Sequence, residues 1–284
     1  MNAINTDNLL TQPEINDLVL EVYGKSKVQQ VAKQIRMGDS GVILQDMHGK
    51  LAEFVVEGAK KPVINPTFTN WKLEPFKIAR IVVTTEEALR VEGALEALML
   101  TELSDSIAHT FDTAFFGGDA AVPTKPVGFD SLTSITDAEV VISGYTSFIQ
   151  AMAPKAGKRP DHIFLNSELL TELQMIVNDH QSPILVFGSS AKYDGTINNV
   201  SYTIIEVPGV VTPVGYTGPF TTRLLWGVVP GSVSIRKSNE ATVVVDGVVV
   251  SLWQENKIAF LCEASYACKA YNLNGEFKKI SASA

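Results

Sequence analysis

Apolar residues recur at helical spacing through a long segment in the first half of the chain. Between residues 94 and 116 they occupy every third or fourth position, namely Leu95, Leu98, Met99, Leu103, Ile107, Phe111, Ala114 and Phe115. This period predicts an amphipathic helix with one buried face. Such a helix is about 34 Å long at a rise of about 1.5 Å per residue. Gly117 and Gly118 are expected to end it.

The residues before this helix predict a long hairpin. Segments 41–57 and 71–83 are rich in β-branched and aromatic residues, whereas segment 58–70 between them is rich in Lys, Pro, Asn and Thr. This pattern indicates two strands joined by a turn-rich tip. An arm of about 12 residues reaches about 40 Å at the rise of a strand. Thr84 and Glu87 then fit a capping box that begins a short helix.

The rest of the chain mixes helices with strands. A helix is predicted at 137–153, then a short buried strand at 163–165, then a helix capped by Asn166 or Ser167. A loop is expected at 180–200. Strands are expected after it, at 201–207, 223–229, 232–237, 241–250 and 254–273. This order of elements predicts an α+β fold.

Composition limits the function. The chain has 284 residues, 45% of them hydrophobic, and a net charge of −8. Proteins that coat nucleic acid cluster Lys and Arg against phosphates, and here only pairs such as Lys60-Lys61 occur. The first residues lack the basic and apolar regions of a secretory signal, and no apolar run is long enough to span a bilayer. We therefore expect a protein made in a cytoplasm, with no membrane partner.

The sequence contains no recognisable catalytic constellation. Gly117-Gly118-Asp119 follows a helix, whereas a phosphate-binding loop precedes one. The histidines have neither a His nor a Cys at metal-ligand spacing. Cys262 and Cys268 lie six positions apart in a predicted strand, so we expect two buried thiols on one face, beyond the reach of a disulfide. We expect no enzymatic activity, no cofactor and no metal.

Four segments, taken in order, resemble a known protein family. They are the turn Glu57 to Pro62 with Thr67-Phe68-Thr69, the long helix with its exit loop Pro126 to Phe129, the segment Ile163 to Leu173, and Trp253-x-x-Asn256 with Leu261-Cys262-Glu263. Their order and spacing resemble those of the major capsid proteins of tailed bacteriophages, the fold first described for phage Hong Kong 97. The resemblance covers the chain from about residue 40 to its end.

The resemblance implies a division of the chain into five parts. Residues 1–38 would form an N-terminal arm, 39–83 the extended loop, and 84–135 the spine helix with the start of the peripheral domain. Residues 136–235 would be mainly the axial domain, and 236–284 mainly strands of the peripheral domain.

The resemblance also implies self-assembly. The subunit would form the hexamers and pentamers of an icosahedral head that encloses double-stranded DNA without binding it specifically. Portal and scaffolding proteins, and optionally a decoration protein, would be its partners in a virion assembled in the cytoplasm of a bacterial host. The N-terminal arm would latch a neighbour. The extended loop would lie across the adjacent subunit, with contacts from Glu57, Gly58, Lys60, Lys61, Pro62, Asn70 and Lys72.

Some members of the family join their subunits covalently. A lysine of the extended loop attacks an asparagine of a neighbour, with a glutamate as proton acceptor. Asn256 and Glu263 match the asparagine and the glutamate, but the aligned lysine position holds Asn70, and Lys72 lies two residues further on the same strand face. Asn256 and Glu263 are seven positions apart, which places them on opposite faces of a regular strand. We expect no cross-link.

Two alternatives remain. An encapsulin-type nanocompartment shares the fold but would enclose a cargo enzyme, and the neighbouring genes would distinguish it from a phage head. A small-molecule α+β enzyme would be a monomer that binds a ligand. The extended loop begins by about residue 41, too early for a built-in scaffolding segment, so we expect a scaffold that is separate or already removed.

Overall fold

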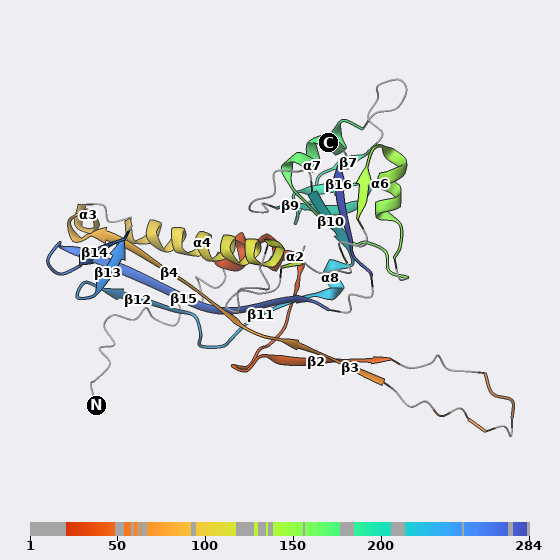
Figure 1. Ribbon diagram of the computed structural model, residues 1–284, viewed down its shortest axis with the longest axis horizontal. Coiled ribbons are helices and arrows are strands. Elements are labelled where there is room, and N and C mark those ends of the chain that lie inside the picture. The colour runs from red at the N-terminus through yellow and green to blue at the C-terminus, as the bar shows by residue number, and fades with distance from the viewer. Residues whose placement is uncertain are drawn as a thin grey trace.

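The computed structural model has three parts: a long spine body, an axial body at one end of it, and a hairpin that projects from its lower side (Figure 1). It describes residues 21–48, 54–57, 60–61, 63, 67–91, 95–117, 128–129, 135, 139–155, 157–176, 185–205, 214–245, 247–271 and 275–282.

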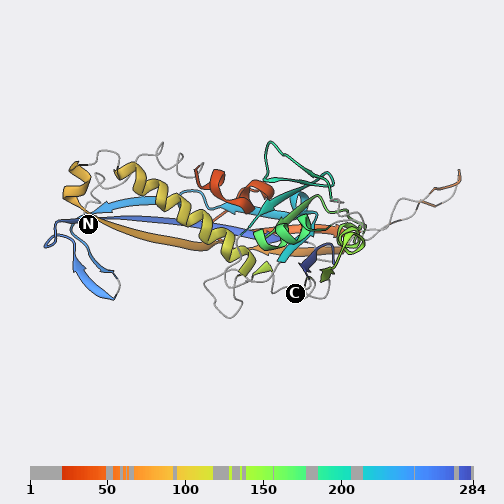
Figure 2. The ribbon, with the colours of Figure 1, turned by 90° about the horizontal axis from the view of Figure 1, so that it is seen from above.

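The spine body is a long helix laid along a five-stranded sheet. The helix is α4 (Leu95–Gly117), within one residue of the prediction at both ends. The sheet contains β1 (Lys33–Gln34), β11 (Leu224–Val228), β15 (Lys257–Ala270) and β12 (Ser234–Ser238) in that order, with β4 (Phe76–Thr85) also paired to β15. Strands β4 and β15 pair antiparallel over ten residue pairs, from Phe76 opposite Tyr266 to Thr85 opposite Lys257. Figures 1 and 2 show α4 running along this ribbon.

The core lies between α4 and the sheet. From α4 it includes Leu103, Ile107 and Phe116, which are almost fully buried in one cluster with Phe260 of β15. Leu98 is exposed, so its assignment to the buried face was wrong. The prediction of two buried thiols without a disulfide is confirmed in part. Both are free, with Cys262 buried and Cys268 half-buried, and burial raises the pKa of Cys262 to about 11.

Short elements close the far end of the spine body. Helix α3 (Glu86–Val91) is capped by Thr85, whose Oγ1 accepts the Ala88 N–H at 3.2 Å, one residue later than the predicted cap Thr84. The predicted strand 241–250 is a hairpin of β13 (Thr242–Val245) and β14 (Val248–Ser251). Gly247 in its turn has a φ of +80°, a conformation that favours glycine.

The axial body is a seven-stranded mixed sheet flanked by two helices, α6 (Tyr145–Met152) and α7 (Ser167–Gln174). In order the strands are β5 (Val140–Ile142), β16 (Lys278–Ala282), β10 (Val214–Gly218), β6 (His162–Leu165), β9 (Val200–Ile204), β8 (Gly195–Ile197) and β7 (Phe187–Gly188). Strand β6 is wholly buried, as predicted. Asn166 caps α7, with its Oδ1 accepting the Leu169 N–H at 3.0 Å.

Two predictions in this body were wrong. The segment predicted as one helix, 137–153, contains β5 followed by α6, separated by Ser143 and Gly144. The segment predicted as a loop, 180–200, contains β7 and β8. In both places the strands are only two or three residues long. Strand β5 pairs with β16, which is distant in sequence, and β8 pairs with β9, which follows it after a turn. Local periodicity is too short to reveal such strands.

The hairpin consists of β2 (Val42–His48) and β3 (Thr67–Leu73), paired antiparallel from Val42 opposite Leu73 to His48 opposite Thr67. The returning strand was predicted as continuous over 71–83, but it breaks at Glu74-Pro75, and β4 then enters the spine sheet. Pro75 has no N–H to continue a strand ladder, which fits a break here.

Part of the predicted N-terminal arm packs on its own subunit. Residues 21–25 are helical, and α2 (Lys27–Val31) and β1 follow them. Val22, Val28 and Val31 are buried in the core of the spine body, and β1 pairs with β11 in parallel. The role of the arm as a latch on a neighbour stays a prediction, and residues 1–20 of the arm lie outside the described part of the chain.

Candidate functional site

One face of the projecting hairpin is exposed along its whole described length. In the register of β2 and β3, Ile43 lies opposite Lys72 and Gln45 lies opposite Asn70. Because side chains alternate along a strand, these four residues share one face with Phe68. All five are exposed. We call this set, Ile43, Gln45, Phe68, Asn70 and Lys72, the outer face of the hairpin.

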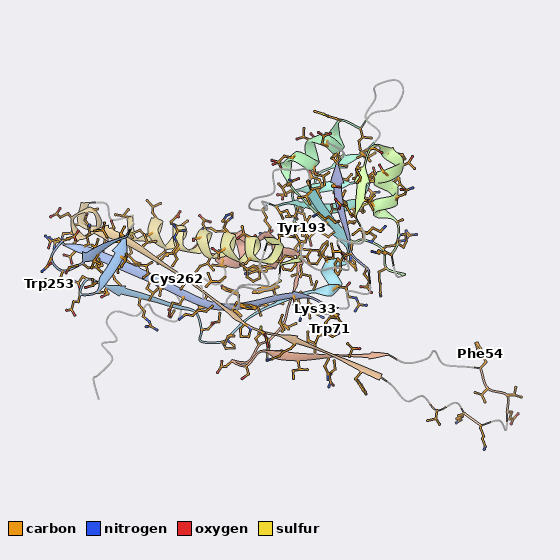
Figure 3. The ribbon with its side chains drawn as sticks, in the orientation of Figure 1. Lys33, Phe54, Trp71, Tyr193, Trp253 and Cys262 are labelled. Carbon is orange, nitrogen blue, oxygen red and sulfur yellow. The ribbon has the colours of Figure 1, made fainter. Side chains whose placement is uncertain are left out.

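The described tip residues extend this exposure. Phe54 is exposed and lies at the far end of the hairpin, distant from both bodies, as Figure 3 shows. Val56 is 81% exposed and Val63 is 90% exposed. A two-stranded ribbon has no core of its own, and large apolar side chains in such a ribbon indicate a surface that another molecule covers.

The predicted contact residues that the structure describes lie on the outer face or at the tip of the hairpin. Glu57, Lys60 and Lys61 are exposed at the tip. Asn70 and Lys72 lie on the outer face, as described above. Gly58 and Pro62 lie outside the described residues. Sequence reasoning selected the charged and turn-forming residues of the tip and missed its apolar ones. The signal was present, since Phe54 and Val56 are large apolar residues next to a turn-rich segment.

The root of the hairpin is fixed to the spine body. Leu73 is buried against Met37 and Ala267. Gly41 has a φ of +83°, and a Cβ at this position would collide with the Leu73 carbonyl oxygen. Lys269 of β15 donates its ammonium to the carbonyl of Lys72 at 3.1 Å. The direction of the hairpin is therefore set where it leaves the sheet, while the described residues of its tip are exposed.

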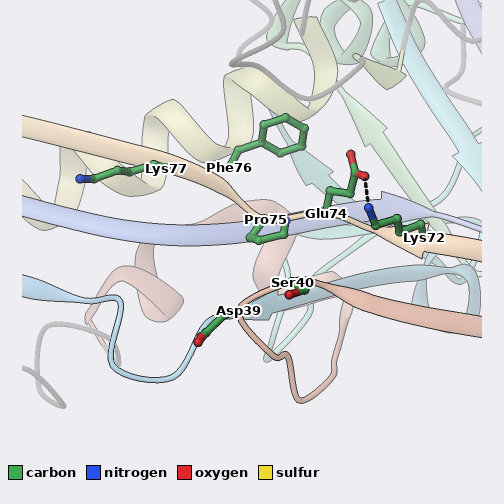
Figure 4. Close-up of a pocket in the computed structure, with 7 residues that line it drawn as sticks. All are labelled: Asp39, Ser40, Lys72, Glu74, Pro75, Phe76 and Lys77. Carbon is green, nitrogen blue, oxygen red and sulfur yellow. Dashed lines mark ion pairs between the residues drawn. The ribbon is translucent and has the colours of Figure 1, made fainter.

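A groove of about 520 Å³ opens at this root (Figure 4). Its polar lining includes Asp39, Lys72, Glu74 and Lys77. Lys72 Nζ lies 2.7 Å from Glu74 Oε1. The hydrogen bond and charge of Lys72 lower the pKa of the Glu74 carboxyl. Lys72 is thus engaged inside its own subunit.

Lys72, Asn256 and Glu263, the three residues compared with the family's cross-link, are not brought together within one subunit. Asn256 was expected in a strand with Glu263. It instead occupies a turn with a φ of +49°, just before β15 begins. Lys72 precedes β4, and Asn256 lies beyond its other end. The ten residues of β4 span about 33 Å at the rise of a strand.

Glu263 is held by cations of its own subunit. Its carboxylate lies 2.6 Å from Lys77 Nζ and 3.8 Å from Arg236 Nη2. The hydrogen bond from Lys77, together with both positive charges, lowers the pKa of Glu263. A carboxylate stabilised in this way is a weaker proton acceptor. The absence of a cross-link remains our prediction, because contacts between subunits lie beyond this single chain.

The described part of the chain contains no group of three or more His, Cys, Asp or Glu residues placed to hold a metal ion. None of the helices described is long and apolar enough to cross a membrane. His162, the one histidine in β6, is buried, and its Nε2 lies 2.9 Å from Thr203 Oγ1. Desolvation lowers the pKa of His162 to about 3, which keeps the ring neutral.

Comparison with known proteins identifies the same architecture. The sequence profile of the Phage capsid family matches residues 8–280. The "Probable major capsid protein gp17" of Mycobacterium phage D29 is 28% identical over 278 residues, which cover 91% of this chain and 85% of the relative. Among solved structures, one from Mycobacterium phage Bobi superposes with a TM-score of 0.68 at 17% identity, covering 100% of this chain and 96% of that one.

A further solved structure extends the comparison to an assembled particle. It is described as "Capsid of empty GTA particle computed with C5 symmetry", and it superposes with a TM-score of 0.69 at 12% identity, covering 92% of this chain and 90% of the other. At such identities the structures establish a shared fold. The spine helix over a long ribbon, the axial body and the projecting hairpin together form a fold of the Hong Kong 97 type. The chain belongs to the Phage capsid family.

Proposed function

We propose that this major capsid protein forms the hexamers and pentamers of an icosahedral phage head around double-stranded DNA. The observation that carries the proposal is the projecting hairpin. Its root is fixed in the spine body, yet its outer face and tip expose Ile43, Phe54, Val56, Val63 and Phe68. In a ring of identical subunits, a projection that each subunit lays on the next is a heterologous contact that closes by rotation.

The rest of the assembly follows from this arrangement. The hairpin would supply the hydrophobic part of each contact, with Glu57, Lys60, Lys61, Asn70 and Lys72 at its polar rim. The axial bodies would meet at the centre of each hexamer or pentamer. A shell of this kind holds its subunits by burial of apolar surface, so no covalent bond between Lys72 and Asn256 is needed.

The contents and partners of the shell are also proposed. A net charge of −8 per subunit favours a shell that encloses DNA without binding its phosphates tightly. Portal, scaffolding and decoration proteins would contact the shell, and assembly would take place in the cytoplasm of a bacterial host. The finished shell would be the virion capsid. The chain would act as a structural protein, with no reaction of its own.

Removing the hairpin's far part tests the proposal. Because His48 lies opposite Thr67, residues 49–66 can be replaced by Asn-Gly, a two-residue turn that keeps the register of β2 and β3. The shortened subunit should fold, because the described residues of this segment, 54–57, 60–61 and 63, are exposed and belong to none of the buried clusters. It should remain a soluble subunit in light scattering and form no shells in negative-stain microscopy. Regular shells from this variant would overturn the proposal.

A finer variant separates apolar burial from simple shortening. Phe54, Val56 and Val63 are changed together to Ser, which keeps the length of the hairpin. We expect loss of shell formation with an unchanged thermal unfolding curve. The matched control is Val186→Ser, because Val186 is also an exposed valine but lies in the axial body. The control should assemble as the unchanged chain does, and equal assembly of the triple variant would refute the role of the tip.

A further inference from the structure

Two short connections with described residues join the axial body to the spine body. Residues 219–223, which include α8 (Phe220–Arg223), lead from β10 of the axial sheet to β11 of the spine sheet. Residues 271–277 lead from β15 back to β16. Figure 1 shows α8 at the meeting point of the two bodies. The relative orientation of the bodies depends on what fixes these connections to each other.

An aromatic cluster fills the inner side of this junction. Phe220 and Phe277, one from each connection, have ring centroids 4.9 Å apart. Phe129 lies 5.6 Å from Phe220 and 5.3 Å from Phe277. Phe116 at the end of α4 lies 6.5 Å from Phe129. Such burial holds the two bodies together, but hydrophobic attraction has no direction, so it does not by itself select one angle between them.

A salt bridge with defined geometry lies across the same two connections. Arg223 Nε is 3.0 Å from Glu276 Oε2, and Arg223 Nη2 donates to Glu276 Oε1 at 3.3 Å. The side chains are only 15% and 5% exposed. The Nη2–Oε1 contact is a hydrogen bond and the Nε–Oε2 contact is an ion pair, so the guanidinium contacts both oxygens of the carboxylate and restrains their relative orientation as well as their distance. The pair thus supplies the direction that the aromatic cluster lacks.

Neighbouring contacts hold Arg223 and the short helix α8 that carries it. The guanidinium lies 5.1 Å from the centroid of the Tyr271 ring, and the Tyr271 N–H donates to the Arg223 carbonyl at 2.9 Å. At the other end of α8, the Asp161 carboxylate accepts hydrogen bonds from the Thr221 N–H, at 3.3 Å, and from the Thr221 hydroxyl. Asp161 directly precedes β6. Helix α8 is therefore fastened to the axial sheet and to the second connection at once.

We propose that Arg223 and Glu276 form a positioning pair that sets the angle between the axial body and the spine body, and through it the curvature of the shell. The link to curvature rests on the proposed function, because the axial bodies would meet at the centre of each capsomer while the spine bodies form its rim. The link to the angle within one subunit does not rest on it. In some proteins a buried polar or ionic group selects one arrangement among several, and the proposal assigns that role to this pair.

The angle is tested by distances within the full-length subunit. Cysteines replace Glu172 of α7 and Thr110 of α4, which are both exposed, and each carries a spin label. Double electron–electron resonance then measures the distance between the two labels, one on each body. We expect a single narrow distance distribution for the unchanged chain. Glu276→Gln should lose that narrow peak and give a broad one. Arg223→Lys, which keeps the charge but not the fork, should broaden it less. The reversed pair R223E/E276R should restore much of the narrow peak.

The control removes a salt bridge that lies inside one body. Lys237 of β12 and Glu96 of α4 are 3.1 Å apart, and both belong to the spine body. Glu96→Gln should leave the distance distribution narrow. Equal distributions for Glu276→Gln and the unchanged chain would overturn the proposal, and so would equal broadening by Glu96→Gln. If Glu276→Gln does not fold, the Arg223→Lys and reversed-pair variants decide on the same readout.

Electron microscopy of the same variants tests the curvature. The unchanged chain should give shells of uniform diameter, and Glu276→Gln should give mixed or misshapen shells, while Glu96→Gln keeps the uniform size. Uniform shells from Glu276→Gln would overturn the link to curvature. If the unchanged chain forms no shells at all, the proposed function fails. The distance measurement then still decides whether the pair sets the angle within the subunit.

Discussion

The molecule contains two long antiparallel ribbons that differ in what covers them. Strands β2 and β3 form the projecting hairpin, and β4 with β15 forms the centre of the spine sheet. The chain passes from one to the other through Glu74-Pro75 alone. The ribbon of β4 and β15 has α4 on one face, which buries Phe260 and Cys262, whereas the outer face of the hairpin is exposed.

This difference separates stability from assembly. A covered ribbon contributes to the folding of its own subunit, because its apolar residues leave water when the chain folds. An uncovered ribbon contributes only when a second molecule covers it. The same residue types therefore serve different purposes, according to whether α4 or a neighbouring subunit packs on them.

The largest expected effect is a contrast between two Phe→Ala changes. Phe260→Ala removes a ring buried under α4 and should lower the free energy of unfolding by about 3 to 5 kcal/mol. Phe54→Ala removes a ring at the hairpin tip and should change it by less than about 0.5 kcal/mol. Denaturant unfolding of the isolated subunit measures both. Similar losses from the two variants would mean that the hairpin is covered within its own subunit.

The covered ribbon and its helix could be predicted from the sequence. The apolar period from Leu95 to Phe115 is long enough to define α4, and the run from Lys257 to Ala270 is long enough to define β15. The turn of the β13–β14 hairpin had a signal that was missed. Asp246-Gly247 is a typical two-residue hairpin turn, and it lies within an apolar run that was assigned to one strand.

What could not be predicted depends on partners that are distant in sequence. Strand β10 has the sequence Val-Gly-Tyr-Thr-Gly, in which two glycines weaken the strand pattern, and it is held by β6 and β16 on either side. Arg223 and Glu276 are separated by 53 positions, and no local pattern joins them. At the site, the charged tip residues were selected by turn chemistry. The outer face follows only from the register of β2 against β3.

Buried titratable groups make the stability of the spine and axial bodies depend on pH. The folded-state pKa of His162 is about 3, below the ordinary value of 6.5, so its contribution to stability is present above pH 6.5 and is lost as the pH falls. Between pH 7 and pH 4 the loss should be about 3 kcal/mol. His162→Gln should remove this part of the acid sensitivity in denaturant unfolding measured at each pH. An unchanged slope would contradict it.

Asp112 of α4 should act in the opposite direction. Its carboxylate accepts hydrogen bonds from Ser26 Oγ at 2.6 Å and from the Lys27 N–H at 2.7 Å. Burial nevertheless raises its pKa to about 6, above the ordinary value of 3.8. Its contribution is therefore fully present below pH 3.8 and is lost as the pH rises through about 6.

The change between pH 4 and pH 7.5 should be about 2 kcal/mol. It is measured as the difference in unfolding free energy between the unchanged chain and Asp112→Asn across that range. Hydrogen exchange of residues 27–31 should follow the same pH dependence, because α2 packs on Asp112 through its first residues. A difference that is flat with pH would show that Asp112 stays ionised when the segment is docked.

The smallest expected effect concerns the point where the two ribbons meet. Lys72 and Glu74 form an ion pair whose side chains are 57% and 55% exposed, so Lys72→Gln should change the unfolding free energy by less than about 0.5 kcal/mol. Assembly should also survive, because the apolar residues of the outer face and tip remain. Mass spectrometry of denatured shells should show separate subunits for the unchanged chain. A covalent dimer that is absent from the Lys72→Gln variant would instead show that Lys72 cross-links neighbouring subunits. The hairpin would then hold its neighbour by a covalent bond as well as by burial of apolar surface.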